Sequence, residues 1–299
     1  MMRALKNIVI RSVFIWLVAV SLAGAEPATD ILHGSGLLWK IEKRNIGSSF
    51  IFGTIHLSDP RVTQLPAPVD KAFYDASRFV MEMLLNARAL QVISNATFFD
   101  DGRTLDLLMQ PEDYEALLAV ARENGLLPEN TIKNMKPWAV LMMMLPGKSD
   151  SGSQEVLDME LYHDAQKRNI PVRGLETAEE QIAIFDALTM HEQIWLLNRS
   201  VQEFDRASVD MKKMIQAYLD RDLAQLVRIQ QSYMYPDSNI DDKLMYAMLQ
   251  ARNHFMADRM QTDLQAGNAF IAIGALHLPG KEGVLHLLEQ KGYKVSAVY

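Results

Sequence analysis

The chain has 299 residues, a formal net charge of −7 and 49% hydrophobic residues, which is enough apolar material for one large core or two small ones. The acidic balance argues against nucleic acid as a partner, because binding to phosphates needs clustered cations. There is no cysteine, which excludes a disulfide framework and thiolate metal sites, so any metal ion must be bound by histidine and carboxylate side chains.

The first 25 residues differ in composition from the rest of the chain. The basic stretch MMRALKNIVIR is followed by the apolar run SVFIWLVAVSLAG and by the small residues Ala23, Gly24 and Ala25. This order predicts a cleaved secretory signal peptide at residues 1–25, and therefore a periplasmic or secreted protein. The alternative is an uncleaved membrane anchor, but the apolar run is shorter than the ~20 residues that a spanning helix needs. No other apolar run approaches that length, so we expect no transmembrane segment after cleavage.

Apolar runs predict three strands in the first third of the chain. The runs LLWKIEK (37–43) and SFIFGTIHL (49–57) flank a polar break, which predicts a β-hairpin. The run SRFVMEM (77–83) predicts a third strand. From about residue 87 to 168 the patterns are helical, and the segments PEDYEALLAVAREN and KPWAVLMMML each begin at or beside a proline, as helices commonly do.

The second half of the chain returns to strands after further helices. The segment IPVRGLE (170–176) predicts a short strand, residues from about 178 to 266 are helical, and the run NAFIAIGAL (268–276) is typical of a buried strand. A helix at 281–290 and a final strand, YKVSAVY, complete the chain. We therefore expect an α/β (α+β) fold with a mixed central β-sheet built from N- and C-terminal strands, surrounded by helices, with a large helical middle region. We expect residues 26–299 to form a single domain.

The pattern G-x-x-H occurs three times, ending at His56, His277 and His286. His56 and His277 each follow an apolar strand and precede a leucine and a turn, which places them just beyond the carboxyl end of a strand, where open α/β sheets bind ligands. We interpret both as functional, and the alternative for each is a histidine that caps a turn. His286 has no strand before it and lies on the polar side of a predicted helix together with Glu282, which favours a solvated helix histidine.

Two glutamates have positions similar to those of the two histidines. Glu82 interrupts the apolar strand FVMEM, and Glu176 ends the strand IPVRGLE immediately before a helix. A carboxylate in a strand otherwise suited to burial must be paired or coordinated. Thr177 and Glu180 have the spacing of a capping box, which leaves Glu176 unexplained. If both glutamates lie at the same edge of the sheet as the histidines, they form an oxygen-and-imidazole cluster suited to zinc, manganese or a similar divalent ion.

Arg252 lies on the apolar face of the predicted helix DKLMYAMLQARNHFMADRM. A guanidinium group on such a face requires a carboxylate partner or a developing oxyanion. The alternative is an arginine that buries its aliphatic stem and extends its charged end to solvent.

Several of these segments resemble the TraB/GumN family, a group related to the Tiki proteins and, more widely, to erythromycin-esterase-like and ChaN-like folds. The resemblance lies in LLWKIEK, FIFGTIHL, FVMEM, GLETAEEQI, the ARN of the long helix, and FIAIGALHLPGKEGVLHLLEQKGYKV. It covers the chain from about Leu37 to Val295. It implies a metal-dependent, peptidase-like site built from two G-x-x-H histidines and a nearby glutamate. The residues it selects are His56, Glu82 and His277, with Glu176, Arg252 and Asn253 in support.

Together these observations predict an exported metal-dependent hydrolase of the peptidase type, with a peptide or protein as its substrate. We expect His56, His277 and a glutamate, Glu82, to bind a divalent ion such as zinc, manganese or cobalt, which activates water. The other glutamate is expected to act as general base, and Arg252 to stabilise the oxyanion. The sequence leaves open which glutamate is the ligand. The residues expected to act in catalysis are Glu82, Glu176, Arg252 and Asn253.

Two other functions are compatible with the same residues. One is a non-catalytic periplasmic protein that binds a peptide or a metal ion and needs no general base. The other is metal-free, esterase-like hydrolysis with a histidine base, which would survive a chelator. The sequence defines neither the substrate nor the oligomeric state.

Overall fold

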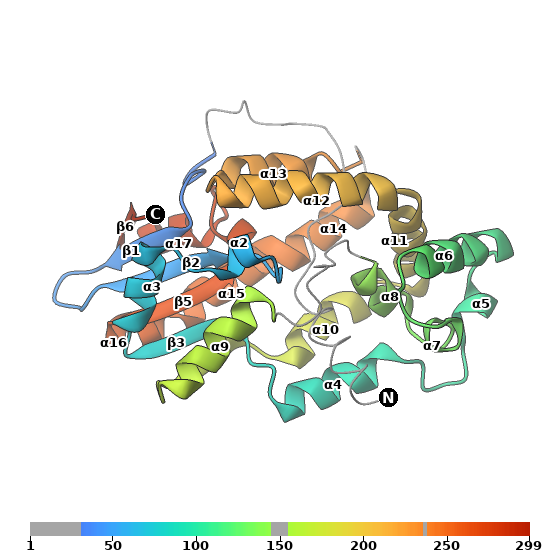
Figure 1. Ribbon diagram of the computed structural model, residues 1–299, viewed down its shortest axis with the longest axis horizontal. Coiled ribbons are helices and arrows are strands. Elements are labelled where there is room, and N and C mark those ends of the chain that lie inside the picture. The colour runs from blue at the N-terminus through green and yellow to red at the C-terminus, as the bar shows by residue number, and fades with distance from the viewer. Residues whose placement is uncertain (1–30, 145–154, 236–237) are drawn as a thin grey trace. The chain divides into compact units, whose positions relative to one another are not determined.

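The computed structural model describes residues 31–144, 155–235 and 238–299 (Figure 1). The predicted signal peptide lies outside these residues. Within them, residue contacts divide the chain into two compact units, one made of residues 85–144 and 177–211, the other of residues 31–84, 155–176 and 212–299. The prediction of a single domain stays a prediction.

The second unit contains a six-stranded mixed sheet in the order β4-β3-β5-β2-β1-β6. The neighbours β4, β3, β5 and β2 run parallel, whereas β1 is antiparallel to both β2 and β6. The β1–β2 hairpin and the α/β fold with a mixed sheet built from both ends of the chain are therefore confirmed. The strands are β1 (Leu38–Glu42), β2 (Ser49–Thr54), β3 (Arg78–Met83), β4 (Val172–Glu176), β5 (Ala269–Gly274) and β6 (Lys294–Ala297).

Strand β5 lies at the centre of the sheet, between β3 and β2. Its residues are buried almost throughout, which explains why its sequence is a continuous apolar run rather than an alternating one. The ring of Phe270 on this strand lies 6.0 Å from Phe52 on β2, 6.3 Å from Phe79 on β3 and 5.2 Å from Phe73. These aromatic contacts tie the parallel strands to a helix on one face of the sheet.

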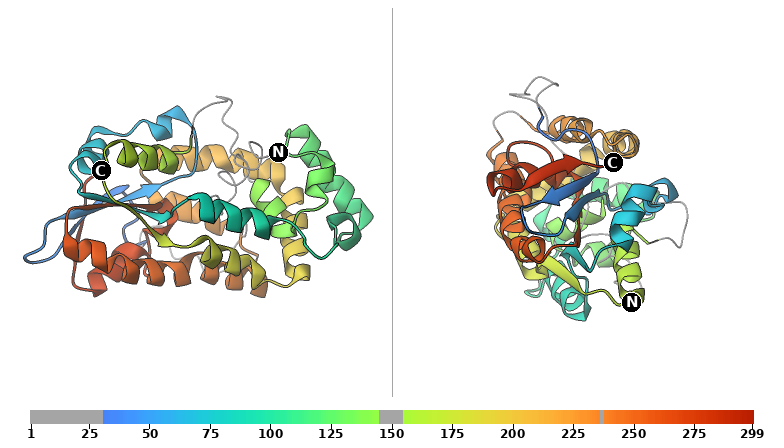
Figure 2. Two further views of the ribbon diagram at one scale, coloured as in Figure 1. Left: turned by 90° about the horizontal axis from the view of Figure 1, so that it is seen from below. Right: turned by 90° about the vertical axis from the view of Figure 1, so that its left-hand side faces the viewer.

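Helices cover both faces of this sheet. Helices α3 and α9 lie on one face, and α15, α16 and α17 lie on the other (Figure 2). Helix α9 packs against β3 and β4, α16 against β5, and α17 against β6. The helices and helical turns of this unit are α2 (Pro60–Thr63), α3 (Ala67–Tyr74), α9 (Leu157–Lys167), α13 (Leu223–Gln231), α14 (Asn239–Met245), η1 (Tyr246–Gln250), α15 (Ala251–Arg259), α16 (Gln261–Ala266), η2 (Ala275–His277) and α17 (Val284–Gln290).

The first unit is helical, in agreement with the patterns in the middle of the sequence. Helix α11 packs against α8 and α6, and α10 packs against α4. The indole of Trp138 on α8 stacks on the ring of Phe185 on α10 with 5.1 Å between centroids. Its helices are α4 (Ala87–Thr97), α5 (Leu105–Leu108), α6 (Pro111–Glu123), α7 (Glu129–Ile132), α8 (Pro137–Met143), α10 (Ala178–Asp186) and α11 (Met190–Gln202), and α12 (Phe204–Leu219) runs from this unit into the other.

Two predicted helices differ in detail from the structure. The segment DKLMYAMLQARNHFMADRM is not one regular α-helix, because the π-helical turn η1 separates α14 from α15. Such wide turns are frequent at functional sites. The helix predicted from residue 281 begins at Val284 instead, after a turn that contains Gly280 at a φ of 91°. In the part of the chain that the structure describes, no helix is both long and apolar enough to cross a membrane.

Candidate functional site

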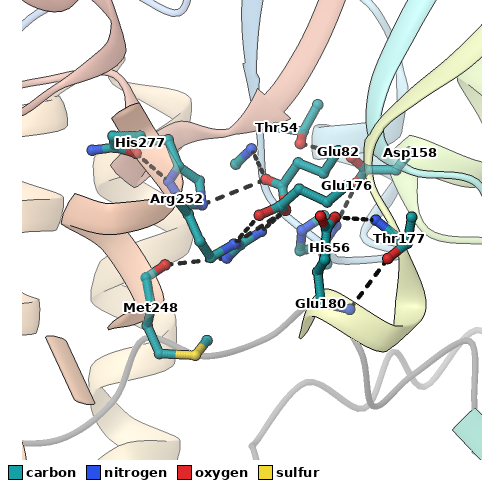
Figure 3. A network of polar contacts seen from close by, with 12 residues as sticks. Thr54, His56, Glu82, Asp158, Glu176, Thr177, Glu180, Met248, Arg252 and His277 are labelled. Atoms are coloured by element: carbon teal, nitrogen blue, oxygen red, sulfur yellow. Dashed lines mark hydrogen bonds and ion pairs between the residues drawn. The ribbon is translucent and has the colours of Figure 1, made fainter. Parts of the chain in front are cut away.

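The two selected histidines follow neighbouring parallel strands. Thr54 ends β2 and pairs in register with Gly274, which ends β5. His56 lies two residues beyond Thr54, and His277 lies three residues beyond Gly274, in the short helical turn η2. Because parallel strands present their carboxyl ends at the same edge, both imidazoles come to one place (Figure 3). The predicted juxtaposition of the two histidines is present in the structure.

The two glutamates lie at the same edge and share one arginine. Glu176 accepts from Arg252 Nε at 2.9 and 3.1 Å and from a terminal nitrogen at 2.6 Å, and Glu82 Oε2 accepts from that nitrogen at 2.7 Å. Arg252 also donates to the carbonyl of Met248 in the π-helical turn, at 3.2 Å. The side chain of Arg252 is only 10% exposed, so its charge is satisfied by carboxylates and not by solvent. Of the interpretations of this arginine, the carboxylate partner is the one that the structure shows.

The surroundings of Glu82 stabilise its ionised form. Burial by itself would raise the pKa of Glu82, but the charges of Arg252, His277 and His56 outweigh burial and lower the pKa to about 2. The backbone N–H of Gly274 donates to Oε1 at 2.5 Å and acts in the same direction. Glu82 is therefore a carboxylate at any physiological pH.

His56 is held by Asp158, a residue that is not among those predicted from the sequence. Its Nδ1 lies 2.6 Å from Asp158 Oδ2, and the hydroxyl of Thr54 donates to Asp158 Oδ1 at 2.8 Å. Burial disfavours the charged ring, but the neighbouring Asp158 outweighs burial, so the pKa of His56 lies above its ordinary value. Asp158 is itself buried, between Leu157 and Met159 at the start of α9. An acid inside the stretch VLDMEL is the signal that could have identified it.

His277 is held in the same way, but by a neutral group. Its Nδ1 lies 2.6 Å from Asn253 Oδ1, and the amide nitrogen of Asn253 donates to the carbonyl of Glu282 at 2.7 Å. Its Nε2 faces Glu82 Oε1 at 3.7 Å. Burial lowers the pKa of His277 to about 3; Glu82 opposes this shift, while Arg252 and His56 add to it. The two G-x-x-H histidines therefore have opposite electrostatic surroundings.

The glycines of the three G-x-x-H patterns are explained by close packing. A Cβ on Gly53 would lie 2.7 Å from Leu278 Cδ1 and 3.1 Å from Ala275 Cα, both in the loop that carries His277. A Cβ on Gly274 would lie 3.0 Å from Glu82 Oε1, and one on Gly283 would lie 2.3 Å from the carbonyl oxygen of Leu278. The third glycine thus supports the second histidine loop.

The remaining predictions on this region concern single contacts. The predicted capping box of Thr177 and Glu180 is present at the start of α10. His286 lies on α17, and its Nδ1 is 3.2 Å from Glu289 Oε2. Glu282 precedes that helix and is paired with His254 at 2.8 Å, so it does not share a helix face with His286 as expected.

The donor types at this edge of the sheet fit a divalent ion. In both histidines Nδ1 is held by an oxygen acceptor, which is the usual arrangement for rings that bind metal through Nε2. The 3.7 Å between His277 Nε2 and Glu82 Oε1 is close to the roughly 3.4 Å that separates two ligands of a tetrahedral ion. The carboxylates of Glu82, Glu176 and Asp158 and the two imidazoles are the oxygen and nitrogen donors that divalent ions accept in proteins. Among the described residues, however, no three His, Asp or Glu side chains form a ready metal-binding group.

Comparison with known proteins gives a family and several distant relatives. Residues 37–297 match the sequence profile of the TraB/PrgY/gumN family. Metalloprotease TIKI1 of Danio rerio is 24% identical over 320 residues, covering 90% of this chain and 64% of that protein. Metalloprotease TIKI2 of Xenopus tropicalis is 22% identical and metalloprotease TIKI1 of Homo sapiens 23% identical, each over 313 residues, covering 88% of this chain and 60% and 62% of those proteins. The chain thus spans less than two thirds of these relatives. No solved structure matches it.

Proposed function

Because this chain belongs to the TraB/PrgY/gumN family, we propose that it is a metal-dependent hydrolase of the peptidase type, acting on a peptide or protein substrate. The relatives named metalloprotease support the hydrolase class at 22–24% identity. The observation that carries the proposal is the pair of histidines, each with its Nδ1 held by an oxygen, that meet the buried carboxylate of Glu82 at one edge of the sheet.

In this proposal His56, His277 and Glu82 hold the ion. Glu82 is the ligand rather than the base, because a carboxylate with a pKa of about 2 takes up a proton poorly and stays charged. His277 suits ligation for the opposite reason, since its low pKa keeps the ring neutral. A divalent ion bound there supplies Lewis acidity and lowers the pKa of a coordinated water.

Glu176 and Arg252 have linked parts in the proposed reaction. Both oxygens of Glu176 accept hydrogen bonds from Arg252, so this contact must loosen before Glu176 can take a proton as general base. An oxyanion that develops on the substrate attracts the guanidinium of Arg252, and this attraction would weaken the contact between Arg252 and Glu176. Asn253 belongs to the same set through its support of His277.

The proposed location of this activity rests on the N-terminal sequence. The predicted signal peptide at residues 1–25 supports export, and we propose a periplasmic or secreted enzyme.

Metal analysis of the mature protein tests the ligand assignment. We expect about one divalent ion per chain in the wild type, and loss of that ion in the double variant His56→Ala/His277→Ala. A His254→Ala variant is the control, because His254 is an exposed histidine outside the cluster. Unchanged metal content in the folded double variant contradicts the assignment.

Peptide-library cleavage with and without a chelator tests the activity and separates it from the two other functions. A metal-dependent peptidase cleaves only without chelator, and Glu82→Gln and Glu176→Gln each reduce its turnover. A binding protein shows no cleavage, and its ligand binding survives Glu176→Gln, because it needs no general base. Cleavage that persists with chelator identifies metal-free hydrolysis and contradicts the proposal.

A further inference from the structure

Asp158 is a buried carboxylate that links the start of α9 to the end of β2 and the loop that follows it. It lies in the first turn of α9, is 3% exposed, and uses one oxygen for Thr54 at the end of β2 and the other for His56. The backbone N–H of Leu157 also donates to the carbonyl of Leu57 at 3.3 Å, which fastens the start of α9 to the loop that carries His56. The position of Asp158 relative to the imidazole is thus set on both sides.

The contact with Asp158 determines which nitrogen of His56 carries a proton. A carboxylate only accepts hydrogen bonds, so at 2.6 Å the Nδ1 of His56 must be the donor. In the neutral ring the lone pair then belongs to Nε2. Thr54 completes the arrangement, because its hydroxyl donates to the second oxygen and prevents the carboxylate from turning.

The same tautomer is determined for His277 by an independent chain of contacts. The carbonyl of Glu282 can only accept, so the amide of Asn253 must present its nitrogen there and its oxygen to His277. Nδ1 of His277 is therefore also the donor, and Nε2 faces Glu82. Two unrelated supports, one charged and one neutral, produce the same tautomer in both rings.

We propose that Asp158, fixed by Thr54, is a positioning residue that orients His56 and sets its tautomer so that Nε2 is the nitrogen that binds the metal ion. The statement that Nε2 binds a metal ion rests on the proposed function. The statement that Asp158 orients His56 and sets its tautomer does not depend on a metal ion. Removing a support of this kind typically lowers the metal affinity of a site by about 10- to 100-fold.

The tautomer of His56 is a direct test that needs neither metal nor substrate. Histidine nitrogens labelled with ¹⁵N report the tautomer by NMR, recorded on the high-pH plateau of the His56 titration, where the ring is neutral. We expect the Nδ1–H form in the metal-free wild type. In Asp158→Ala we expect a shift toward the Nε2–H form that imidazole prefers in water, with His277 unchanged. An Nε2–H ring in the wild type overturns the proposal, even if the variants fail to fold.

Zinc affinity, measured by competition with a chelating dye, is the second test. We expect Asp158→Ala to raise the dissociation constant by about 10- to 100-fold, and Asp158→Asn to raise it less, because an amide oxygen can still accept from Nδ1. Asp164→Asn on the same helix is the control, since Asp164 is an exposed partner of Lys167. A folded Asp158→Ala protein with wild-type affinity overturns the proposal. A wild type that binds none of zinc, manganese and cobalt refutes the proposed function instead, and the tautomer of His56 then decides on Asp158 alone.

Discussion

Replacing Arg252 with methionine should destabilise the protein strongly, because the substitution leaves two buried carboxylates facing each other. The side chains of Glu82 and Glu176 are 4% and 5% exposed, and Arg252 binds both of them. Removing one partner of a buried ion pair costs about 3–5 kcal/mol, since an uncompensated charge remains. Methionine keeps much of the stem's volume, so the loss reports on charge more than on packing.

The destabilisation caused by Arg252→Met has an upper limit that depends on pH. A glutamate with an ordinary pKa of 4.5 can take up a proton instead of remaining charged, which at pH 7 costs roughly 3.5 kcal/mol. At pH 5 the same protonation costs less than about 1 kcal/mol. The destabilisation of Arg252→Met relative to the wild type should therefore shrink by more than about 2 kcal/mol between pH 7 and pH 5.

Urea unfolding of wild type and variant at both pH values measures these differences. Glu176→Gln in the Arg252→Met background should recover part of the loss, with a coupling energy of about 1–3 kcal/mol in the double-mutant cycle. The control is Arg61→Met, which removes an exposed partner of Asp59 and should leave unfolding nearly unchanged. A loss below about 1 kcal/mol in Arg252→Met at pH 7, or a loss equal at pH 5 and pH 7, refutes the reasoning.

Two other predictions concern the glycines and the acid range. Gly53→Ala should destabilise by about 1–3 kcal/mol in thermal unfolding, because its Cβ would lie 2.7 Å from Leu278, whereas Gly47→Ala, with 3.7 Å to its nearest neighbour, should be tolerated; equal effects would contradict the packing argument. The metal-free protein should lose stability as the pH falls from about 6.5 toward 3. The pKa of His277 is lowered in the folded state, so the unfolded chain takes up the proton first, and the slope reaches about 1.4 kcal/mol per pH unit. Urea unfolding across this range should show a shallower slope in His277→Gln, and an identical slope would exclude this origin.

Local patterns in the sequence are sufficient to predict the strands and the candidate site residues at their ends. The continuous run of β5 and the apolar run of β3 gave the right elements, because burial of a strand requires apolar side chains that are visible in a short window. His56 and His277 were recognised because each follows such a strand. The helix around Arg252 was correct in type, but its π-helical turn was not predictable, since the residues of η1 have ordinary helical preferences.

The sequence did not identify the groups that hold these residues in place. Asp158 lies 102 residues from His56 and 104 from Thr54, and no periodicity relates the three. A carboxylate partner is predicted for Arg252 from the sequence. The identity of that partner, and the presence of two carboxylates instead of one, depend on how α15 meets the ends of β3 and β4.

The sequence by itself determined the α/β class, the strands and the candidate histidines and glutamates, because hydrophobic periodicity and strand ends are local properties of the chain. The tertiary structure decided the charges and orientations of those residues. Burial lowers the pKa of His277, and the charges of Arg252 and His56 act in the same direction, whereas at His56 the carboxylate of Asp158 outweighs burial and raises the pKa. These effects arise between segments that only folding brings within a few ångströms of one another. His56 and His277 therefore have different electrostatic surroundings although both belong to the same G-x-x-H motif.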